Sequence, residues 1–324
     1  MRTVQRGSYR QAIVLSESKE HSEALLRFLN ENTIHPIFIH AQFPSAVASF
    51  SYIAPNLYPA IYRLTKIIIN EYPNPSMFVG FNEDSFSDKC KIDGFITAMT
   101  ESGVPYKIVT NTGNIEACIN DVISKITKYK NYICANDELA LLLIKSLKEQ
   151  GLSLNDFNIS GSSNMKVGAL SKPSLTTVMG DRDYYNEGIL AVDTYVRRYK
   201  SKLGQNIFIN LDCKIVLRES THLKIKTPDV SPILPHNAAK FVNFYENPSI
   251  SKIDRLEYLL GNCDEIDMSI LHGLIANKTY EMIAELNNIA INTVKYRIKK
   301  MENNLAIKNR CELRTYLCEF DLNI

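Results

Sequence analysis

The first two-thirds of the chain alternates short runs of β-favouring residues with amphipathic helical segments. Apolar runs at residues 12–15, 35–40 and 77–80 are separated by segments with helical spacing at residues 20–30 and 59–71. The same alternation continues to about residue 218. Strands that alternate with helices in this way are typical of parallel sheets joined by helical crossovers. The sequence therefore predicts an α/β fold for this part of the chain.

The alternation ends at a proline-containing stretch. Pro228, Pro232 and Pro235 fall within eight residues, a density that neither a helix nor a central strand tolerates. Beyond this stretch the spacing of apolar residues is helical. We therefore divide the chain into an α/β domain (residues 1–223), a proline-containing linker (224–262) and an all-α domain (263–324).

The composition excludes a few classes of protein. The chain has 324 residues, with 37 Lys and Arg against 35 Asp and Glu, so it is not basic throughout. Its seven cysteines are dispersed and form no CxxC pair, which is typical of a reducing compartment. No apolar run approaches the roughly 20 residues that span a membrane, and the N-terminus has no apolar signal core. We expect a cytoplasmic protein with no membrane partner.

The all-α domain has the spacing of several short helices. They are expected at residues 268–275, 280–286 and 292–301, with a fourth from about residue 309. Thr279 and Asn292 are the predicted N-caps of the second and third helices. Asn287 and Asn288 form the predicted turn between them, because Asn tolerates a left-handed backbone.

Basic residues concentrate on the third of these helices and just beyond it. Six basic residues and one acidic residue lie between residues 290 and 310. Lys295 and Lys299 are four residues apart and share one helix face, with Tyr296 and Lys300 beside them. Such a face suits the major groove of duplex DNA. The alternative is an ordinary solvated face on a helical bundle.

Six short motifs follow one another over about 50 residues of this domain. They are Ile270-Leu271, Lys278-Thr279, Ile283-Ala284, Thr293-Val294-Lys295, Leu305-Ala306-Ile307 and Asn309-Arg310-Cys311-Glu312-Leu313. Their order and spacing resemble the C-terminal helix-turn-helix of LuxR-type regulators. One residue departs from that pattern, because Asn287 stands where the family usually packs a Leu and Leu286 lies one place early.

The resemblance implies a set of DNA contacts. Residues Lys295, Tyr296 and Lys299 would face the groove, with phosphate contacts from the approach to the second helix and from the start of the fourth. The candidate DNA-binding residues are Lys278, Thr279, Asn292, Thr293, Lys295, Tyr296, Lys299, Lys300, Lys308 and Arg310. Because one such module buries little surface, we expect a homodimer on a two-part DNA site.

The α/β domain carries motifs of another family, in the matching order. They are Val79-Gly80 with Ser87, Lys91 and Gly94-Phe95; Asn136-Asp137 with Ala140; Pro173 with Leu175-Thr176-Thr177-Val178; and Leu217-Arg218 with Ser220-Thr221. These motifs resemble the effector domain of LacI-type repressors. The resemblance implies a two-lobed, periplasmic-binding-protein-like sensor with parallel sheets.

The same resemblance implies an effector site at the carboxyl ends of the strands, where open α/β sheets bind ligands. The candidate effector-binding residues are Ser87, Lys91, Asn136, Glu138, Ser162 and Ser163. Lys91 replaces an Arg of the family, and Ser163-Asn164 stands where the family has carboxylates. Both changes remove hydrogen-bonding groups that the family uses, so we expect weaker hydrogen bonding to a sugar. The alternative is that these residues are caps and turns in a degenerate cleft.

The start of the sensor departs from the family pattern. Residues 12–15 align with the family's third strand, so the opening strand-helix-strand-helix and the usual N-terminal DNA-binding headpiece are missing. Either the first lobe is abbreviated and its edge is covered, or the start of a longer chain is absent. An uncovered edge would favour association with another chain.

The sequence gives no support for an enzyme. It contains no GxSxG, P-loop, GxGxxG or HExxH motif, and its six histidines do not cluster with Cys or Asp. We expect no catalytic residues, no metal and no cofactor. The function expected from the sequence is a DNA-binding transcription regulator whose sensor binds a small-molecule effector, such as a sugar or related metabolite. The alternative is a constitutive DNA-binding dimer whose α/β domain is only a scaffold.

Overall fold

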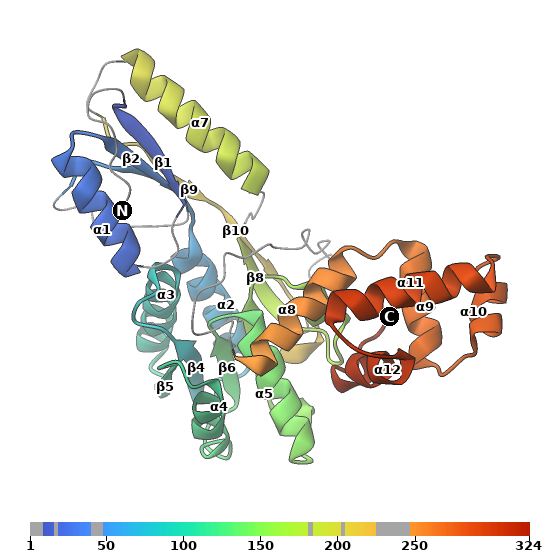
Figure 1. Cartoon of the computed structure of the whole chain (residues 1–324). Helices are drawn as coiled ribbons and strands as arrows, with labels where there is room; N and C mark the ends of the chain where they lie inside the picture. The colour runs from blue at the N-terminus through green and yellow to red at the C-terminus, as the bar shows by residue number, and fades with distance from the viewer. Residues whose placement is uncertain (1–8, 16–18, 40–47, 181–183, 202–204, 225–246) are drawn as a thin grey trace.

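The computed structural model describes residues 9–15, 19–39, 48–180, 184–201, 205–224 and 247–324. These residues form two α/β lobes and a group of helices at the C-terminal end of the chain (Figure 1). The predicted α/β class is correct for the first part of the chain. The proline-rich residues 225–246 lie outside the described residues.

The larger lobe, called the C-lobe here, is built on a sheet with the order β10-β8-β7-β6-β4-β5. Its strands are β4 (Ser76–Phe81), β5 (Tyr106–Thr110), β6 (Asn131–Cys134), β7 (Asn158–Ser162), β8 (Thr176–Gly180) and β10 (Cys213–Val216). All neighbours are parallel except β10 and β8, which are antiparallel. The carboxyl ends of β4, β6 and β7 therefore meet at one edge of the sheet.

Five helices lie between the strands of the C-lobe. They are α2 (Leu57–Glu71), α3 (Phe86–Ser102), α4 (Ile115–Ile123), α5 (Asp137–Glu149) and α6 (Lys166–Leu170). Two short 3-10 turns, Leu154–Asp156 and Glu219–Thr221, complete it. Helices α2 and α3 pack closely at Gly94, where a Cβ would lie 2.4 Å from the backbone oxygen of Tyr58. The motif glycine is therefore explained by helix packing.

The smaller lobe, called the N-lobe, has a parallel sheet in the order β1-β2-β3-β9. Its elements are β1 (Gln11–Leu15), α1 (Lys19–Glu31), β2 (His35–Ile39), β3 (Ser51–Pro55), α7 (Tyr184–Ser201) and β9 (Phe208–Leu211). Helix α1 covers one face, where Leu26 and Leu29 pack with Phe38. Helix α7 covers the other face, where Ala191 packs with Ile37 and Ile53.

The C-terminal helices are α8 (Pro248–Gly261), α9 (Glu265–Ile275), α10 (Tyr280–Leu286), α11 (Ile291–Leu305) and α12 (Arg310–Glu319). Helix α8 lies inside the range 224–262 assigned to the linker, and it agrees with the helical spacing expected beyond the prolines. The side chain of Asn247 caps this helix and Pro248 occupies its first turn, a position that suits proline. The buried apolar residues of α8–α12 continue without a break into the core of the C-lobe.

No helix in the described ranges combines the length and the apolar character needed to cross a membrane.

Candidate functional site

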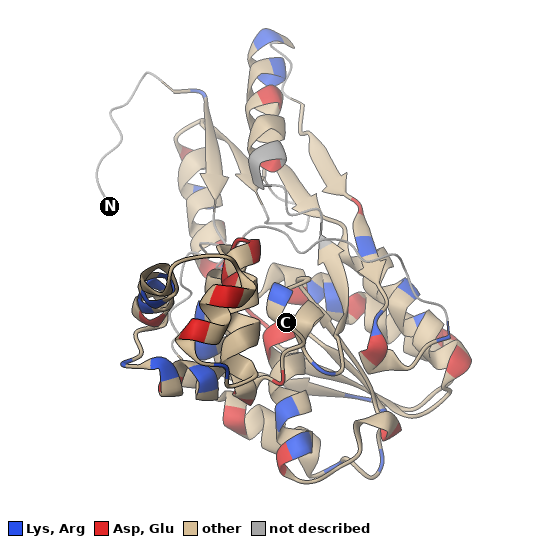
Figure 2. Ribbon diagram, turned by 90° about the vertical axis from the view of Figure 1, so that its right-hand side faces the viewer, with Lys and Arg blue, Asp and Glu red and all other residues tan. Residues whose placement is uncertain are grey.

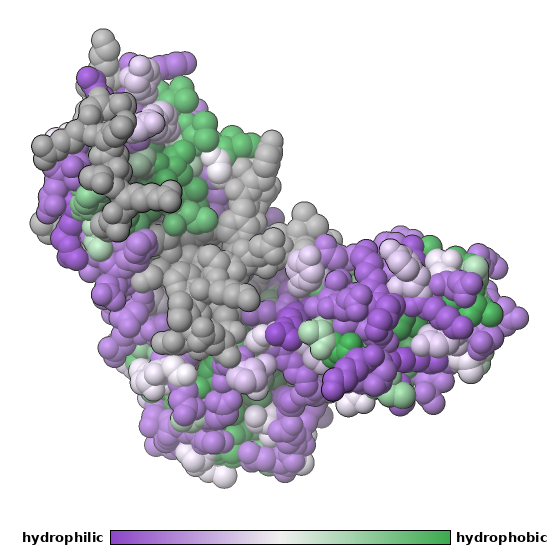
Figure 3. Space-filling view, in the orientation of Figure 1, coloured by the Kyte–Doolittle hydropathy of each residue, from purple (hydrophilic) through white to green (hydrophobic). Residues whose placement is uncertain are grey.

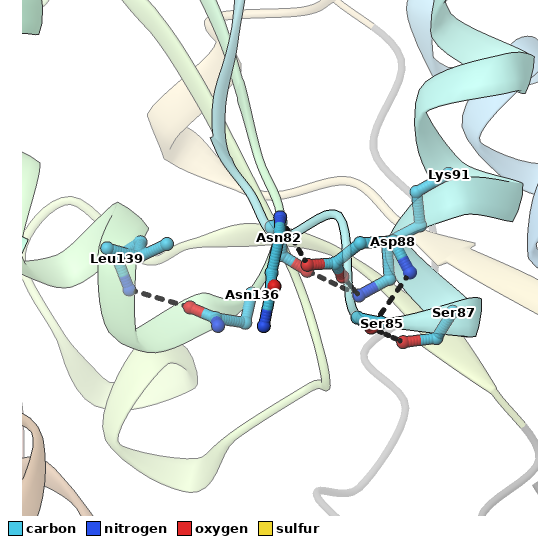
Figure 4. Close-up of polar contacts among 8 residues, drawn as sticks. Asn82, Ser85, Ser87, Asp88, Lys91, Asn136 and Leu139 are labelled. Carbon is cyan, nitrogen blue, oxygen red and sulfur yellow. Dashed lines mark hydrogen bonds and ion pairs between the residues drawn. The ribbon is translucent and has the colours of Figure 1, made fainter. Parts of the chain in front are cut away.

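The loop after β4 forms one side of the candidate effector site (Figure 4). Ser85 caps α3, because its Oγ accepts from the backbone N–H of Asp88 at 3.2 Å. The Ser85 and Ser87 hydroxyls are 3.0 Å apart, and the backbone N–H of Asn82 donates to Asp88 Oδ2 at 3.3 Å. Ser87 is half-buried. This loop is therefore held in place by its own hydrogen bonds.

Lys91 ties this loop to the end of β6. Its buried ammonium donates to Asp88 Oδ1 at 3.0 Å and to the backbone oxygen of Ala135 at 2.6 Å. Lys91 was expected to face an effector. In the structure its charge is instead paired within the protein, so its geometry is that of a group that positions the two neighbouring loops.

The loop after β6 forms the middle of the site. Asn136 caps α5 by accepting from the backbone N–H of Leu139 at 2.9 Å (Figure 4), and Glu138 is buried one residue past Asp137. Asp137, which the sequence analysis did not select, is fully buried. Its Oδ1 accepts from the hydroxyl of Thr177 at 2.7 Å, and its Oδ2 accepts from the backbone N–H of Met165 at 2.8 Å.

A glycine makes room for this aspartate. A Cβ at Gly161 would lie 2.2 Å from Asp137 Oδ1. Because any side chain at 161 would displace the carboxylate, this close approach explains why residue 161 is a glycine. The sequence signal for Asp137 was its place in the motif Asn136-Asp137, which comes directly after β6.

The end of β7 forms the far side of the site. Ser162 is buried, and the backbone N–H of Ser163 donates to the hydroxyl of Thr177 at 3.2 Å. Asn164, which follows Ser163, has an Oδ1 that accepts from Arg218 Nη2 at 2.6 Å. The structure thus brings five of the candidate residues to one edge of the sheet, at the carboxyl ends of adjacent strands and in the first turns of the helices that follow them: Ser87, Asn136, Glu138, Ser162 and Ser163.

A second candidate surface lies on α11. Its exposed residues include Asn292, Lys295, Tyr296, Lys299 and Lys300, which share one face of the helix. Tyr296 is 71% exposed. The opposite face buries Val294, Ile298, Met301 and Leu305. Thr293 lies between the two faces and is half-buried.

The predicted caps and turn are partly correct. Thr279 caps α10 by accepting from the backbone N–H of Met282 at 3.3 Å, and Asn288 has a left-handed φ of 52°. The assignment of Asn292 as an N-cap is wrong. Helix α11 begins at Ile291, so Asn292 lies in its first turn, and Ala290 precedes the helix without a side-chain cap.

The departure at Asn287 also has a structural reason. Its Nδ2 donates to the backbone oxygen of Ile283 at 2.8 Å. This hydrogen bond stabilises the last turn of α10. Leu286, one place earlier, is 59% exposed. The end of α10 is therefore held by an amide hydrogen bond rather than by a buried leucine.

Tyr280 gathers basic side chains at the start of α10. The Arg310 guanidinium lies 4.6 Å from the centre of its ring and Lys295 Nζ lies 5.8 Å from it. Arg310 also donates to the backbone oxygen of Lys278. Thr279, which precedes Tyr280, and Lys308, two residues before Arg310, are also exposed. Tyr280 was not among the candidate DNA-binding residues.

Acidic side chains neutralise part of the basic charge. Arg297 forms ion pairs with Asp264 at 2.8 Å and Asp267 at 2.7 Å, which holds the pKa of Asp264 below its usual range. Lys299 Nζ lies 3.0 Å from the buried Glu302. Figure 2, in which these helices face the viewer, shows both basic and acidic segments on them.

Across the residues whose placement is described, no three His, Cys, Asp or Glu side chains are grouped so that they could hold a metal ion.

Comparisons with known proteins concern about half of the chain. No protein-family model matches it. Catabolite control protein A of Priestia megaterium is 26% identical over 170 residues, which are 50% of this chain and 50% of that protein. The HTH-type transcriptional repressor PurR of Pasteurella multocida is 25% identical over 171 residues, or 51% of each chain. The chain thus spans about half the length of these curated relatives.

Solved structures share the fold of the two lobes. The transcriptional regulator CelR, in a complex with cellobiose, superposes with a TM-score of 0.57 and 15% identity over 65% of each chain. The chain therefore has an α/β, periplasmic-binding-protein-like fold with parallel sheets, as expected. By their names, PurR and CelR are transcription regulators and not enzymes.

Proposed function

We propose that this chain is a cytoplasmic, ligand-responsive transcription regulator. Its two α/β lobes bind a small-molecule effector, and its C-terminal helices bind duplex DNA through a LuxR-type helix-turn-helix made of α10 and α11. The observation that carries the proposal is the exposed face of α11, where three lysines and Tyr296 follow the left-handed turn at Asn288. A homodimer would place two such helices on a two-part DNA site.

The charge distribution favours DNA over a purely structural role for α11. Lys295 and Lys300 make no ion pair with the described residues, and their ammonium groups are exposed. Tyr280 holds Arg310 beside Lys295, so a cluster of positive charge extends past the start of the helix. Amines and guanidinium groups in such a cluster neutralise phosphates and release counterions.

The effector site favours an uncharged polar ligand. Lys91 is paired with Asp88, and Asn164 replaces a carboxylate. The groups with hydrogen-bonding capacity at the edge are therefore the hydroxyls and amide of Ser87, Asn136 and Ser162, together with the carboxylate of Glu138. Hydroxyls and amides suit a sugar or a related metabolite. The complex of CelR with cellobiose supports the same class of ligand.

A short chain of contacts connects the two sites through α6. Asp137 at the effector edge accepts from the backbone N–H of Met165 at 2.8 Å, just before α6. Glu257 of α8 accepts from the next two N–H groups, those of Lys166 and Val167, at 2.8 Å each. Helix α8 in turn packs against α11. A ligand that moves the loop after β6 would therefore displace the elements that carry α11.

DNA binding is tested with the variant Lys295→Ala/Lys299→Ala. Fluorescence anisotropy with a random-sequence duplex of about 30 base pairs measures the binding constant at several salt concentrations. The logarithm of this constant falls linearly with the logarithm of the salt concentration, and each lost phosphate contact makes that slope smaller by about 0.9. We expect a slope smaller by about 1 to 2 and weaker binding. The matched control is Arg63→Ala/Lys89→Ala, which removes two exposed charges from α2 and α3. Equal slopes for the two variants would contradict the assignment of α11.

Effector binding is tested by a thermal-shift screen of sugars, nucleosides and amino acids. A ligand that binds only the folded chain raises stability by about 2.7 kcal/mol at 100 times its Kd. We expect at least one sugar-like compound to raise the Tm, and we expect Ser87→Ala to reduce that shift.

The second candidate function is a constitutive DNA-binding dimer with a ligand-free α/β scaffold. The internal pairing of Lys91 with Asp88 favours it, because this pairing removes a charged group from the effector edge. A flat thermal-shift screen together with intact DNA binding would support this alternative.

A further inference from the structure

Exposed apolar side chains gather around α10, and Figure 3 shows hydrophobic atoms there, at the right-hand end of the molecule. Met282 and Leu286 of α10 are 48% and 59% exposed, and Ile291, which begins α11, is 37% exposed. All three lie between residues 282 and 291. Single exposed apolar residues are common on protein surfaces, whereas a group of them is typical of a contact surface.

An open groove of about 540 Å³ lies between α10 and the start of α11. Its lining includes Ala284, which is buried, and Ile289, which is half-buried. Ala290 and Ile291 line it on the side of α11. Because alanine side chains fill little space, the surface is hollowed between the two helices. The groove therefore has room for apolar side chains of a bound partner.

Two carboxylates border this groove on the side of α10. Glu281 and Glu285 both line it, and because they are four residues apart they lie on one face of the helix. Met282 and Leu286 each follow one of these glutamates and form the adjoining stripe. Helix α10 thus presents an acidic stripe between the groove and an apolar stripe. We call Glu281, Met282, Glu285, Leu286 and Ile291 the α10 surface.

The two carboxylates are available to a partner. Both are exposed, and neither forms an ion pair with the described residues. Hydrogen bonds to the Glu281 carboxylate, from its own backbone N–H and from the Thr279 hydroxyl, hold its pKa below its usual range. The charges of Lys295 and Arg310, which lie beyond ion-pair distance, act in the same direction. Glu281 therefore remains ionised at neutral pH.

We propose that the α10 surface docks a helix of another protein, one whose contact face combines lysine or arginine with large apolar residues. Glutamates one helical turn apart match basic residues at the same spacing on a partner helix. Apolar side chains beside those basic residues would enter the groove. Two carboxylates repel DNA phosphates and acidic proteins alike, so charge selects a basic protein segment. The inference goes beyond the proposed function and does not depend on DNA binding.

The α10 surface lies next to the basic face of α11. Ile291 begins α11 one helical turn before Lys295. Helix α10 packs against α9 and α11, and Figure 1 shows it at the end of the molecule farthest from the N-lobe. A helix bound to this surface would therefore lie beside the duplex expected on α11 rather than against the lobes.

The test measures binding of a labelled peptide to the full chain by fluorescence anisotropy. The probe is a helical peptide of about 16 residues made of Leu, Lys and Ala, with Leu on one face and Lys beside it. The control peptide has the same composition in an order that places the Leu residues on no common face. We expect the control to bind at least about tenfold more weakly, because only the probe presents both kinds of group together. Equal binding of the two peptides, or no binding of the probe, would overturn the proposal.

One variant removes the apolar stripe. Met282→Gln/Leu286→Gln keeps good helix formers at two exposed positions, so its circular dichroism spectrum should be unchanged. We expect it to bind the probe at least about tenfold more weakly than the unchanged chain does. The matched control is Ile67→Gln, at an exposed apolar position of α2, which should bind the probe normally. Unchanged binding by Met282→Gln/Leu286→Gln would contradict the proposal.

A second variant removes the acidic stripe. Glu281→Gln/Glu285→Gln should bind the probe more weakly and with a smaller dependence on salt, because the attraction to lysine is lost. The matched control, Glu149→Gln/Asp156→Asn, removes two exposed carboxylates from the C-lobe. If both variants lost the same affinity, the peptide would be responding to net charge alone, and the assignment of the α10 surface would be wrong.

Hydroxyl-radical footprinting separates a protein partner from the other occupants. The bound probe should protect Met282 and Leu286 from oxidation, whereas a random-sequence duplex should leave both reactive. Protection of these residues by the duplex would assign the surface to DNA and overturn the proposal. Protection that appears without any peptide as the chain is concentrated, and is lost in Glu281→Gln/Glu285→Gln, would assign it to a second copy and would also overturn it.

Discussion

Lys91 shows how one buried charge holds the edge of the C-lobe together. Its side chain and that of Asp88 are 9% and 12% exposed, and the two charged atoms are 3.0 Å apart. The same ammonium also donates to the backbone oxygen of Ala135 at the end of β6. Removal of the lysine would leave both acceptors buried without their cation, which is costly in a poorly solvated site.

We therefore predict that Lys91→Met lowers the free energy of unfolding by about 3 to 5 kcal/mol. Urea denaturation followed by circular dichroism measures the change. The control is Lys89→Met on the same helix, whose ion pair with Asp93 is exposed and is worth less than about 1 kcal/mol. If the two variants lost the same stability, the role of Lys91 in positioning the loops would be wrong.

Single residues also show what the sequence could predict about the sites. The strand-end motifs located Ser87, Asn136 and Ser162 at one edge of the sheet, because parallel strands end at the same edge. The motifs did not reveal the partners of Lys91 and Asp137, because Ala135, Met165 and Thr177 approach them only through the fold. A motif gives the position of a side chain but not its hydrogen-bond or ion-pair partners.

Regular periodicity predicted most helices and strands, and two segments beside prolines show where its limits lie. Residues 51–55 were not assigned as a strand, yet they form β3 between β2 and β9, with Pro55 at its end. Residues 248–261 fall inside the range 224–262 assigned to the linker, although helical spacing was expected beyond the prolines, and Pro248 begins α8. Proline excludes the interior of a helix but is favourable in its first turn. The density of prolines before residue 236 gave no information about that boundary.

Helix α8 carries two carboxylates in a partly buried position. Burial, together with the nearby Glu257, raises the pKa of Asp254 to about 6. Burial also raises the pKa of Glu257, whose oxygens accept the N–H groups at the start of α6. An acid with a raised pKa binds its proton more tightly in the folded state, so its contribution to stability falls as pH rises from about 4 to about 6.

We predict that Asp254→Asn raises the free energy of unfolding at pH 7 by up to about 3 kcal/mol and changes it little at pH 4. The difference between variant and unchanged chain in urea denaturation at the two pH values measures this effect. The control is Asp84→Asn, at an exposed loop position. This variant should change the free energy of unfolding by the same amount at both pH values. If Asp254→Asn raised the free energy of unfolding equally at pH 4 and pH 7, ionisation of Asp254 would not destabilise the folded chain.

At the scale of the whole molecule, the C-terminal helices are not joined to the C-lobe by a linker alone. Glu319 of α12 pairs with Lys145 of α5 and Lys252 of α8, and Lys148 lies 2.8 Å from Asp321. Tyr316 donates to the backbone oxygen of Lys252 at 2.7 Å. The N-lobe has two small apolar clusters of its own, whereas α8–α12 share one cluster with the C-lobe. The domain boundary expected near residue 262 therefore does not separate two cores.

This division predicts which parts of the chain open together. Native-state hydrogen exchange reports the opening free energy of each element, and amides of α9 and α11 should share the value found for β6 and β7. Amides of β1 and β2 should open at a lower free energy, since their clusters are smaller. Glu257→Ala, which removes the acceptor at the start of α6, should lower protection in α11 and β7 together and leave β2 unchanged. Loss of protection in α11 alone would instead mean that the C-terminal helices open independently, and the proposed route from the effector edge to α11 would then have no structural basis.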